Sequence, residues 1–242
     1  MSEQIAENIA NIRQQIATAA QQAGRSPAEI MLIGVTKTHP AAIVEQALAA
    51  GLADVGENRV QEAESKITAL SAERQRLTWH LIGHLQSNKA KKAAQLFNMI
   101  HSVDSLRLAQ QLDRAASELR TQPLDILLQV NVSGEVAKEG FDLVGWETHQ
   151  ATLSTFLLAV EQIVTLSHLQ VRGLMTIAPI ARVPEDARPH FASTRILREH
   201  LAHTFPQADW SQLSMGMSND FDAAIAEGAT MVRIGRAIFG SR

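Results

Sequence analysis

Lys37 invites a chemical interpretation because it ends the apolar run of LIGVTKTHP (residues 32–40). A lysine at the end of a strand is often only a solvated charge. Inside a pocket its ammonium would be partly desolvated and its pKa lowered, and the neutral amine can attack an aldehyde to form a Schiff base. Lys37 therefore has two interpretations at this point, as a solvated terminus or as a reactive amine.

Two glycine-containing junctions near the C-terminus, SMGMSNDF (214–221) and RIGRAIFG (233–240), indicate a place for an anion. Glycine lets a ligand approach the backbone, and the free N–H groups at the start of a helix attract phosphate. The alternative is that these glycines only form turns. Pyridoxal 5′-phosphate (PLP) carries both an aldehyde and a phosphate, so it could bridge Lys37 and this region.

Arg233 lies inside the apolar run TMVRIG (230–235), and a buried arginine needs a partner. The pyridine nitrogen of PLP is one candidate acceptor. Arginine stays protonated, so it would donate to that nitrogen and leave it unprotonated, which weakens the ring as an electron sink. The alternative partner is a barrel carboxylate such as Glu57.

Metal-binding patterns are weak, and no metal site is predicted. His80 and His84 are four residues apart, but WHLIGH (79–84) is typical of a strand, where this spacing is too long for one ion. His200 and His203 fit one helix face without a third ligand nearby. The chain has no cysteine, which excludes thiolate ligands and disulfides.

Composition and charge limit the partners. The 22 basic and 25 acidic residues nearly balance, so neither nucleic acid nor a membrane surface is predicted as a partner. GHLQSNKA (83–90) resembles a phosphate-binding loop only superficially, because Asn88 replaces its second glycine and Ala90 its Ser/Thr. The polar N-terminus lacks signal-peptide features, and no apolar run approaches the ~20 residues of a membrane helix. A cytoplasmic protein is therefore expected.

Short apolar runs alternate with helical patterns along the chain. The predicted strands are 31–36, 53–57, 79–84, 99–103, 126–131, 171–177, 213–217 and 231–235. The predicted helices are an N-terminal one carrying Ile5, Ile9, Ile12 and Ile16, then 41–50, 104–120 with Asp104 as N-cap, 146–165 and 186–203. Longer loops are expected at 137–146 and 177–189.

Eight such units match the size of a (β/α)8 TIM barrel with an extra N-terminal helix, in one domain covering 1–242. Several strands are apolar throughout, as expected when both faces of a parallel sheet are buried. A doubly wound open sheet is the competing architecture. In a barrel, polar residues at the carboxyl ends of the strands form the site, and the last strand is a neighbour of the first.

The chain also resembles the pyridoxal phosphate homeostasis proteins, the YggS/PROSC-type family, along nearly its whole length. The matching stretches, in family order, are LIGVTKTHP (32–40), VGENRVQEA (55–63), WHLIGHLQSNKAK (79–91), HSVDS (101–105), LLQVNVSGE (127–135), KEGF (138–141), RGLMTIAP (172–179), LSMGMSNDFDAAIAEGAT (213–230) and VRIGRAIFG (232–240). The resemblance implies a barrel like the N-terminal domain of alanine racemase, with PLP as the cofactor.

Roles for individual residues follow from this resemblance. It implies that Lys37 forms the Schiff base and that Arg233 faces the pyridine nitrogen. It implies that the pocket and the phosphate site are formed by Asn58, His84, Ser214, Gly216, Ser218, Gly235 and Arg236. Arg236 departs from the small hydroxyl residue that is usual in the family, so only a backbone contact to the phosphate would survive there.

The resemblance and the residues favour a carrier over an enzyme. Alanine-racemase-like enzymes use a tyrosine from a second domain as the base opposite the lysine. This chain has no tyrosine and ends two residues after Gly240, and that second domain is not expected. The predicted function is reversible PLP binding and vitamin B6 homeostasis by a non-catalytic monomer, with PLP-dependent apo-enzymes as candidate recipients. The alternatives are a weak racemase or transaminase and, third, a class I aldolase.

Overall fold

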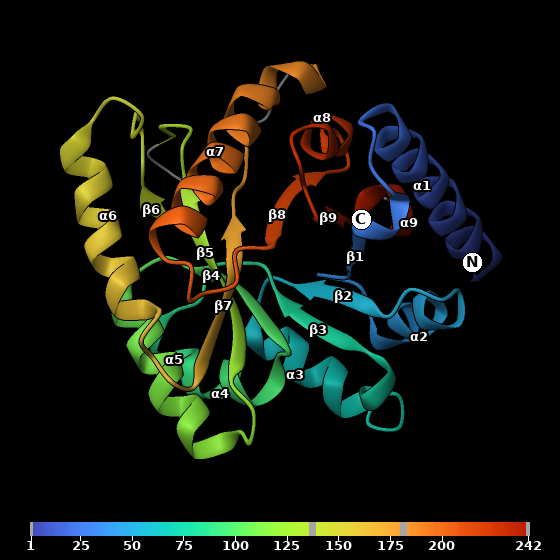
Figure 1. Cartoon of the computed structure of the whole chain (residues 1–242). Helices are drawn as coiled ribbons and strands as arrows, with labels where there is room; N and C mark the ends of the chain where they lie inside the picture. Colours follow the sequence, from blue (N-terminus) through green and yellow to red (C-terminus); the bar gives the residue numbers. More distant parts are fainter. Residues whose placement is uncertain (1, 136–138, 180–182, 241–242) are drawn as a thin grey trace.

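The computed structural model describes residues 2–135, 139–179 and 183–240 (Figure 1). Eight parallel strands close into a barrel in the order β1-β2-β3-β4-β5-β7-β8-β9, with β4 paired to β5 and β9 paired to β1. The strands are β1 Met31–Val35, β2 Asp54–Glu57, β3 Thr78–Leu81, β4 Met99–Val103, β5 Leu124–Asn131, β7 Leu169–Met175, β8 Gln212–Met217 and β9 Met231–Ile234. The predicted TIM barrel is confirmed, and the open sheet is wrong because the two edges pair.

Helices cover the outside of the barrel (Figure 1). The α-helices are α1 Ser2–Gln22, α2 Ala41–Ala49, α3 Val60–Ala69, α4 Ala90–Leu96, α5 Leu106–Leu119, α6 Gln150–Ile163, α7 Arg188–Thr204, α8 Phe221–Ala226 and α9 Arg236–Phe239. Short 3-10 turns are η1 Pro27–Glu29, η2 Arg74–Arg76, η3 Ser87–Lys89 and η4 Pro184–Ala187. None of the helices in the described ranges is both long and apolar enough to cross a membrane.

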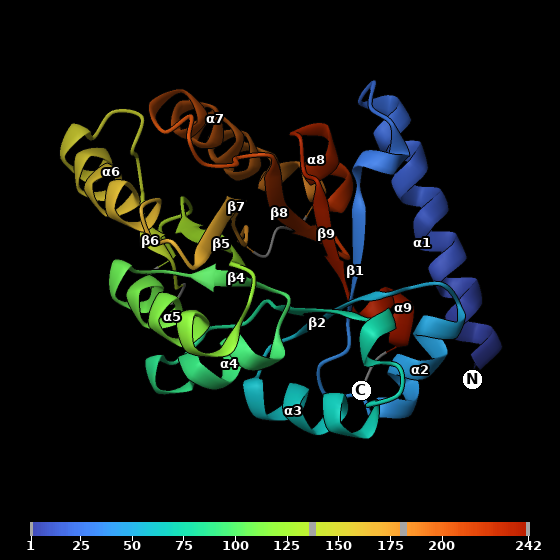
Figure 2. The ribbon, with the colours of Figure 1, turned by 60° about the horizontal axis from the view of Figure 1, so that its bottom comes forward.

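Helix α1 is the predicted additional N-terminal helix. Its isoleucines Ile5, Ile9, Ile12 and Ile16 recur at helical spacing and are all buried. Figure 2 shows α1 lying along α8, α9 and α2, which are the elements it contacts. The helix therefore covers the place where the last barrel units meet the first.

The structure differs from the sequence predictions at several boundaries. Ser105, not Asp104, caps α5, because the Ser105 hydroxyl accepts the Leu108 N–H at 3.3 Å. Strand β3 ends at Leu81, so His84 follows the strand instead of ending it. Helix α3 and the two-residue strand β6 (Phe141–Asp142), which pairs with β5, were not predicted.

The two predicted loops lie partly outside the described residues, at 136–138 and 180–182, as does Lys138 of KEGF. Within the described part of 177–189, the chain forms η4 and the start of α7.

Alternation along the strands separates two cores. A small cluster from five different strands fills the barrel interior and consists of Ile33, Met99, Leu127, Met175 and Met231. The larger cluster lies between the strands and the helices. Because side chains two residues apart share a strand face, the interior cluster shows which polar residues point into the barrel.

Candidate functional site

Lys37 follows β1 and is partly buried at the carboxyl end of the barrel. Strand β1 pairs with β9 in the register Gly34 to Ile234, which brings the residues after each strand together. A side chain at Gly235 would lie 3.3 Å from the Val35 carbonyl oxygen. His39 and Phe239 are also in ring contact, with centroids 5.5 Å apart. Lys37 therefore lies beside the junction that begins α9.

The residue after Lys37 has a strained backbone. Thr38 has φ of +68°, a left-handed conformation that a β-branched residue rarely adopts. Its N–H donates to the Glu62 carboxylate on α3, and its hydroxyl donates to the Lys37 carbonyl oxygen at 2.6 Å. Such conformations persist where surrounding contacts hold them, and they concentrate at functional sites. These contacts fix the backbone direction on the C-terminal side of Lys37.

A buried polar network between the outer face of the strands and α3 holds Glu62 in place. Lys66 donates to Glu57 at 2.6 Å, to Glu62 at 2.8 Å and to the Thr36 carbonyl oxygen at 2.7 Å, which uses its three N–H donors. The Thr36 hydroxyl also donates to Glu57 at 2.5 Å. We call Thr36, Glu57, Glu62 and Lys66 the outer clamp. It ties the end of β1 to β2 and α3.

Burial dominates the electrostatics of the outer clamp. Desolvation raises the pKa of Glu57 even though hydrogen bonds from Lys66 and Thr36 oppose the shift. Glu57 Oε2 is buried and has no hydrogen-bond partner among the described residues. Glu62 is less buried, and bonds from Lys66 and Thr38 outweigh desolvation and lower its pKa. Glu57 thus pairs with Lys66, and the alternative Glu57–Arg233 ion pair is wrong.

Arg233 is buried inside the barrel, on the face of β9 that also carries Met231. Its guanidinium donates to the Ser214 carbonyl oxygen at 2.6 Å, the Ser214 hydroxyl at 2.7 Å and the Thr176 carbonyl oxygen at 2.9 Å. Burial lowers its pKa to about 10, against a smaller opposing effect of Asp220. These bonds use three of its five N–H donors, and the other two have no acceptor among the described residues.

The β8–α8 junction is shaped by Gly216, which has φ of +93°. A side chain there would approach Ala224 Cβ to 2.7 Å, so glycine permits the close packing of α8 on the strand. Asp220 Oδ1 accepts the Met217 N–H at 2.6 Å and closes the turn that carries Ser218. Ser218 is partly exposed.

At the neighbouring junction Gly235 precedes the first residue of α9, Arg236, whose side chain is exposed. The first N–H groups of a helix have no acceptor within it, so this backbone can donate to an anion.

Asn58 and His84 line one cavity of about 230 Å³ at the barrel mouth. The cavity is lined by residues at or after the carboxyl ends of strands β2, β3, β5 and β7: Asn58, Ile82, Gly83, His84, Gln129, Val130, Asn131, Glu139 and Ile177. Gly83 is required because a side chain there would meet the Asn58 backbone oxygen at 2.5 Å. This close approach places Asn58 and His84 side by side.

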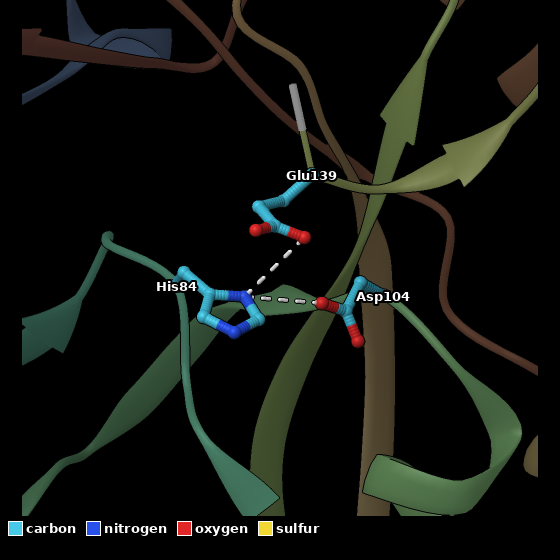
Figure 3. Close-up of side chains that lie close together, drawn as sticks. All are labelled: His84, Asp104 and Glu139. Atoms are coloured by element: carbon cyan, nitrogen blue, oxygen red, sulfur yellow. Dashed lines mark ion pairs between the residues drawn. The ribbon is translucent and has the colours of Figure 1, made fainter. Parts of the chain in front are cut away.

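His84 faces two carboxylates at the rim of this cavity (Figure 3). Its Nδ1 lies 3.3 Å from Asp104 Oδ2 and 3.7 Å from Glu139 Oε2. The three ligand atoms lie within 4.8 Å of one another, so this is the group of described side chains whose geometry could hold a cation. The group was not predicted from the sequence, because its three members are distant in sequence and two are exposed.

The structure distributes the predicted residues over four places in the barrel. Asn58 and His84 share the mouth cavity, whereas Lys37 follows β1 and Gly235 and Arg236 follow β9, which pairs with β1. Ser214 is bonded to Arg233 deeper in the barrel, and Gly216 and Ser218 form the β8–α8 turn. Lys66 and His101 were missed: each looked like an ordinary helix cation or strand residue, and only their contacts reveal a polar network.

Fold and site together define a barrel of the alanine racemase N-terminal type. The family model "Alanine racemase, N-terminal domain" matches residues 7–242. Curated relatives carry the name pyridoxal phosphate homeostasis protein: the one from Pseudomonas aeruginosa is 48% identical, covering 98% of this chain and 96% of that one. The Escherichia coli relative is 42% identical, with 98% and 97% covered. The chain belongs to the pyridoxal phosphate homeostasis protein family.

Solved structures agree with this assignment. PipY of Synechococcus elongatus, solved with PLP bound, superimposes with a TM-score of 0.83 at 42% identity and covers 98% of this chain and 100% of that chain. An alanine racemase from Clostridium difficile superimposes with a TM-score of 0.68 at 14% identity, covering 99% of this chain and 57% of that one. The second likeness concerns the fold alone.

Proposed function

We propose that this chain binds PLP as a Schiff base on Lys37 and serves vitamin B6 homeostasis as a non-catalytic carrier or buffer. The observation that carries the proposal is the adjacency of Lys37 to the Gly235 junction across the β1–β9 pair, with Arg233 buried on β9 below. The PLP complex of PipY, at 42% identity, supports the same ligand here.

The residues present fit PLP. Arg233 has two N–H donors beyond its three hydrogen bonds to the barrel, and either could donate to the ring nitrogen of the cofactor, which accepts one hydrogen bond. The backbone before α9 offers donors for the phosphate, with Ser218 on the neighbouring junction and the exposed Arg236 side chain outside it. Asn58, His84, Ser214 and Gly216 complete the proposed set, with Ser214 acting through its bond to Arg233.

Binding needs an unprotonated Lys37 amine. The cofactor supplies an aldehyde to this amine, and the condensation forms a C=N bond with release of one water molecule. The outer clamp and Thr38 hold the backbone on the C-terminal side of the lysine, so less conformational freedom is lost on binding. Because the condensation is reversible, the same lysine can retain the cofactor and give it up again.

The absence of catalysis is inferred from what Arg233 can do. Arginine donates hydrogen bonds but does not release its proton, so the ring nitrogen beside it stays unprotonated. A ring without that positive charge is a weaker electron sink for carbanion chemistry. This favours holding the cofactor over using it on a substrate.

The decisive experiment is borohydride reduction of the protein incubated with PLP, followed by peptide mapping. A pyridoxyl group on the peptide containing Lys37, absent in Lys37→Ala, is the expected result. Lys91→Ala is the matched control, because Lys91 is an exposed lysine paired with Glu118. An unmodified Lys37 in the wild-type chain contradicts the proposal.

A second candidate function is a weak racemase or transaminase, and the His84 group favours it. An imidazole between two carboxylates can take up and return a proton at the cavity rim. Steady turnover of an amino acid that is lost in both Lys37→Ala and His84→Ala would establish this function. A pyridoxyl group on Lys37 after borohydride reduction, without turnover of any amino acid, favours the carrier.

The remaining parts of the proposal concern context. We propose one PLP-binding domain over 1–242 that acts as a monomer and delivers PLP to apo-enzymes that depend on it. Transfer to an apo-enzyme tests the delivery step, and sedimentation tests the monomer. The cytoplasmic location stays a prediction.

A further inference from the structure

A chain of five polar side chains crosses the barrel interior. His80 Nε2 lies 3.2 Å from Asp54 Oδ1, His80 Nδ1 lies 3.0 Å from His101 Nε2, and His101 Nδ1 lies 2.9 Å from Ser214 Oγ. Arg233 then donates to Ser214 Oγ at 2.7 Å. We call Asp54, His80, His101, Ser214 and Arg233 the barrel relay. Its members come from β2, β3, β4, β8 and β9.

The relay runs from one end of the barrel to the site. Asp54 opens β2 at the amino end and is partly exposed, whereas the other four members are buried. Arg233 lies toward the carboxyl end of β9, one residue before the strand ends. The relay therefore joins a carboxylate near solvent to the guanidinium proposed to face the cofactor.

When both imidazoles are neutral, the chemistry of the groups fixes the direction of every hydrogen bond. Asp54 as a carboxylate only accepts, so His80 donates through Nε2–H; in neutral His80, Nδ1 must then accept from His101 Nε2–H. Burial, then the neighbouring His80 and Arg233, hold the pKa of His101 well below its ordinary value, so this ring is neutral.

The Arg233 end has the same direction. The unprotonated Nδ1 of His101 accepts from the Ser214 hydroxyl, and that hydroxyl oxygen accepts from Arg233, which has only donors. All donors thus point from Arg233 toward Asp54.

With the donors pointing in this direction, the Ser214 hydroxyl oxygen can accept the hydrogen bond from Arg233. If the His101 proton moved to Nδ1, it would donate to Ser214 Oγ, and the serine proton would have to turn toward a guanidinium that cannot accept it. The acceptors bonded to Arg233 are all uncharged: Ser214 O, Ser214 Oγ and Thr176 O. A buried cation held by neutral groups depends on their dipoles being correctly oriented.

We propose that the barrel relay is a positioning device, in which Asp54 sets the orientation of both imidazoles and Ser214 and thereby aims Arg233 at the cofactor ring. The proposal rests on the proposed function for the identity of the ligand. It assigns Asp54, His80 and His101 as positioning residues that do not touch the ligand.

The first test needs no cofactor. Long-range 1H–15N correlation spectra of the apo-protein distinguish the two neutral imidazole tautomers, and single substitutions assign the signals. At pH 8 we expect both His80 and His101 as Nε2–H tautomers. An Nδ1–H tautomer in either ring overturns the relay, whatever the protein binds.

The second test uses the PLP-loaded protein. Asp54→Asn keeps an acceptor for His80 but removes the charge that sets the order. Asp125→Asn is its matched control, because Asp125 lies near the same end of the barrel, on β5, is similarly exposed (30% against 27%) and is bonded to Arg172 instead. Ser214→Ala removes the middle of the relay and leaves the backbone acceptor.

We expect PLP to bind about three- to tenfold more weakly in Ser214→Ala, as for loss of one buried hydrogen bond. In Asp54→Asn we expect a smaller loss of PLP affinity. The absorption band of the bound cofactor should shift in the same direction in Asp54→Asn as in Ser214→Ala. Asp125→Asn should match wild type.

If Asp54→Asn and Asp125→Asn have the same PLP affinity and the same absorption band while borohydride still labels Lys37, the relay proposal is wrong and the proposed function stands. If the wild type is not labelled at Lys37, the proposed function fails, and the tautomers alone decide the relay.

Discussion

The outer clamp and the barrel relay lie on opposite faces of the barrel wall and share strand β2. Strand β2 points Asp54 inward to the barrel relay and Glu57 outward to the outer clamp, because the two residues are three positions apart and strand faces alternate. In the outer clamp, Lys66 touches two carboxylates directly. In the barrel relay, the side chains of His80, His101 and Ser214 separate Arg233 from Asp54.

This difference indicates two kinds of task. The ammonium of the outer clamp has its donors fully used, so it can only hold β1, β2 and α3 together. The guanidinium of the barrel relay keeps two donors, and no carboxylate among the described residues takes them. A saturated ion pair stabilises the backbone that carries Lys37, whereas an unsaturated cation is suited to a ligand. Substitutions in the two networks should therefore separate stability from binding.

The largest effect is expected when the outer clamp is broken by Lys66→Met. Glu57 would lose its charged partner in a fully buried position, and removing one partner of a buried pair costs about 3–5 kcal/mol. Urea unfolding measures this loss. The control is Lys92→Met, whose pair with Glu64 has both side chains 42% exposed and should contribute less than about 1 kcal/mol. If Lys66→Met and Lys92→Met lower the free energy of unfolding equally, the outer clamp does not stabilise the fold as a buried ion pair.

The second prediction concerns the barrel relay and uses Arg233→Met. Methionine fills a similar apolar volume and leaves no bonded carboxylate unpaired among the described residues, so the loss of stability should be smaller than in Lys66→Met. PLP affinity should instead fall about 10- to 100-fold, as expected when a charged hydrogen-bond donor is lost. Parallel urea unfolding and PLP titration give the ratio of the two effects. If the free energy of unfolding falls as far as in Lys66→Met while PLP affinity is unchanged, the proposed division of tasks is wrong.

The same comparison shows what sequence reasoning can reach. Apolar runs and helical periodicity predicted the eight barrel strands, and the barrel then explained why Lys37 and Gly235 are neighbours. The two polar networks were not predicted. In the barrel relay, for example, the hydrogen bond between His101 and Ser214 joins residues 113 positions apart. Lys66 looked like any helix cation, and its burial depends on how α3 packs against β2. Which face a residue occupies follows from alternation, but its partner follows from strand order and register.

The third prediction concerns the pH dependence of stability, to which His101 of the barrel relay contributes. Burial holds the pKa of His101 below its ordinary value of 6.5, so as pH falls the unfolded chain binds a proton that the folded chain refuses. This contribution to stability is complete above pH 6.5 and falls by about 1.4 kcal/mol per pH unit below it, until the folded-state pKa is reached.

His101→Gln should remove this slope in urea unfolding measured between pH 8 and 5. His203→Gln, which changes an exposed histidine outside both networks, should retain it. An unchanged slope in His101→Gln would show that His101 is not held neutral.

The smallest expected effect is at Thr38, where the outer clamp meets the lysine. A left-handed conformation costs a non-glycine residue about 1–2 kcal/mol, and glycine avoids that cost while losing about 0.5–1 kcal/mol through its greater freedom when unfolded. Thr38→Gly should therefore stabilise the chain by up to about 1 kcal/mol, whereas Thr38→Ala, which keeps a Cβ at φ of +68°, should not. Urea unfolding of both variants tests this. A glycine variant no more stable than the alanine variant would mean that the contact with Glu62 does not hold a strained residue.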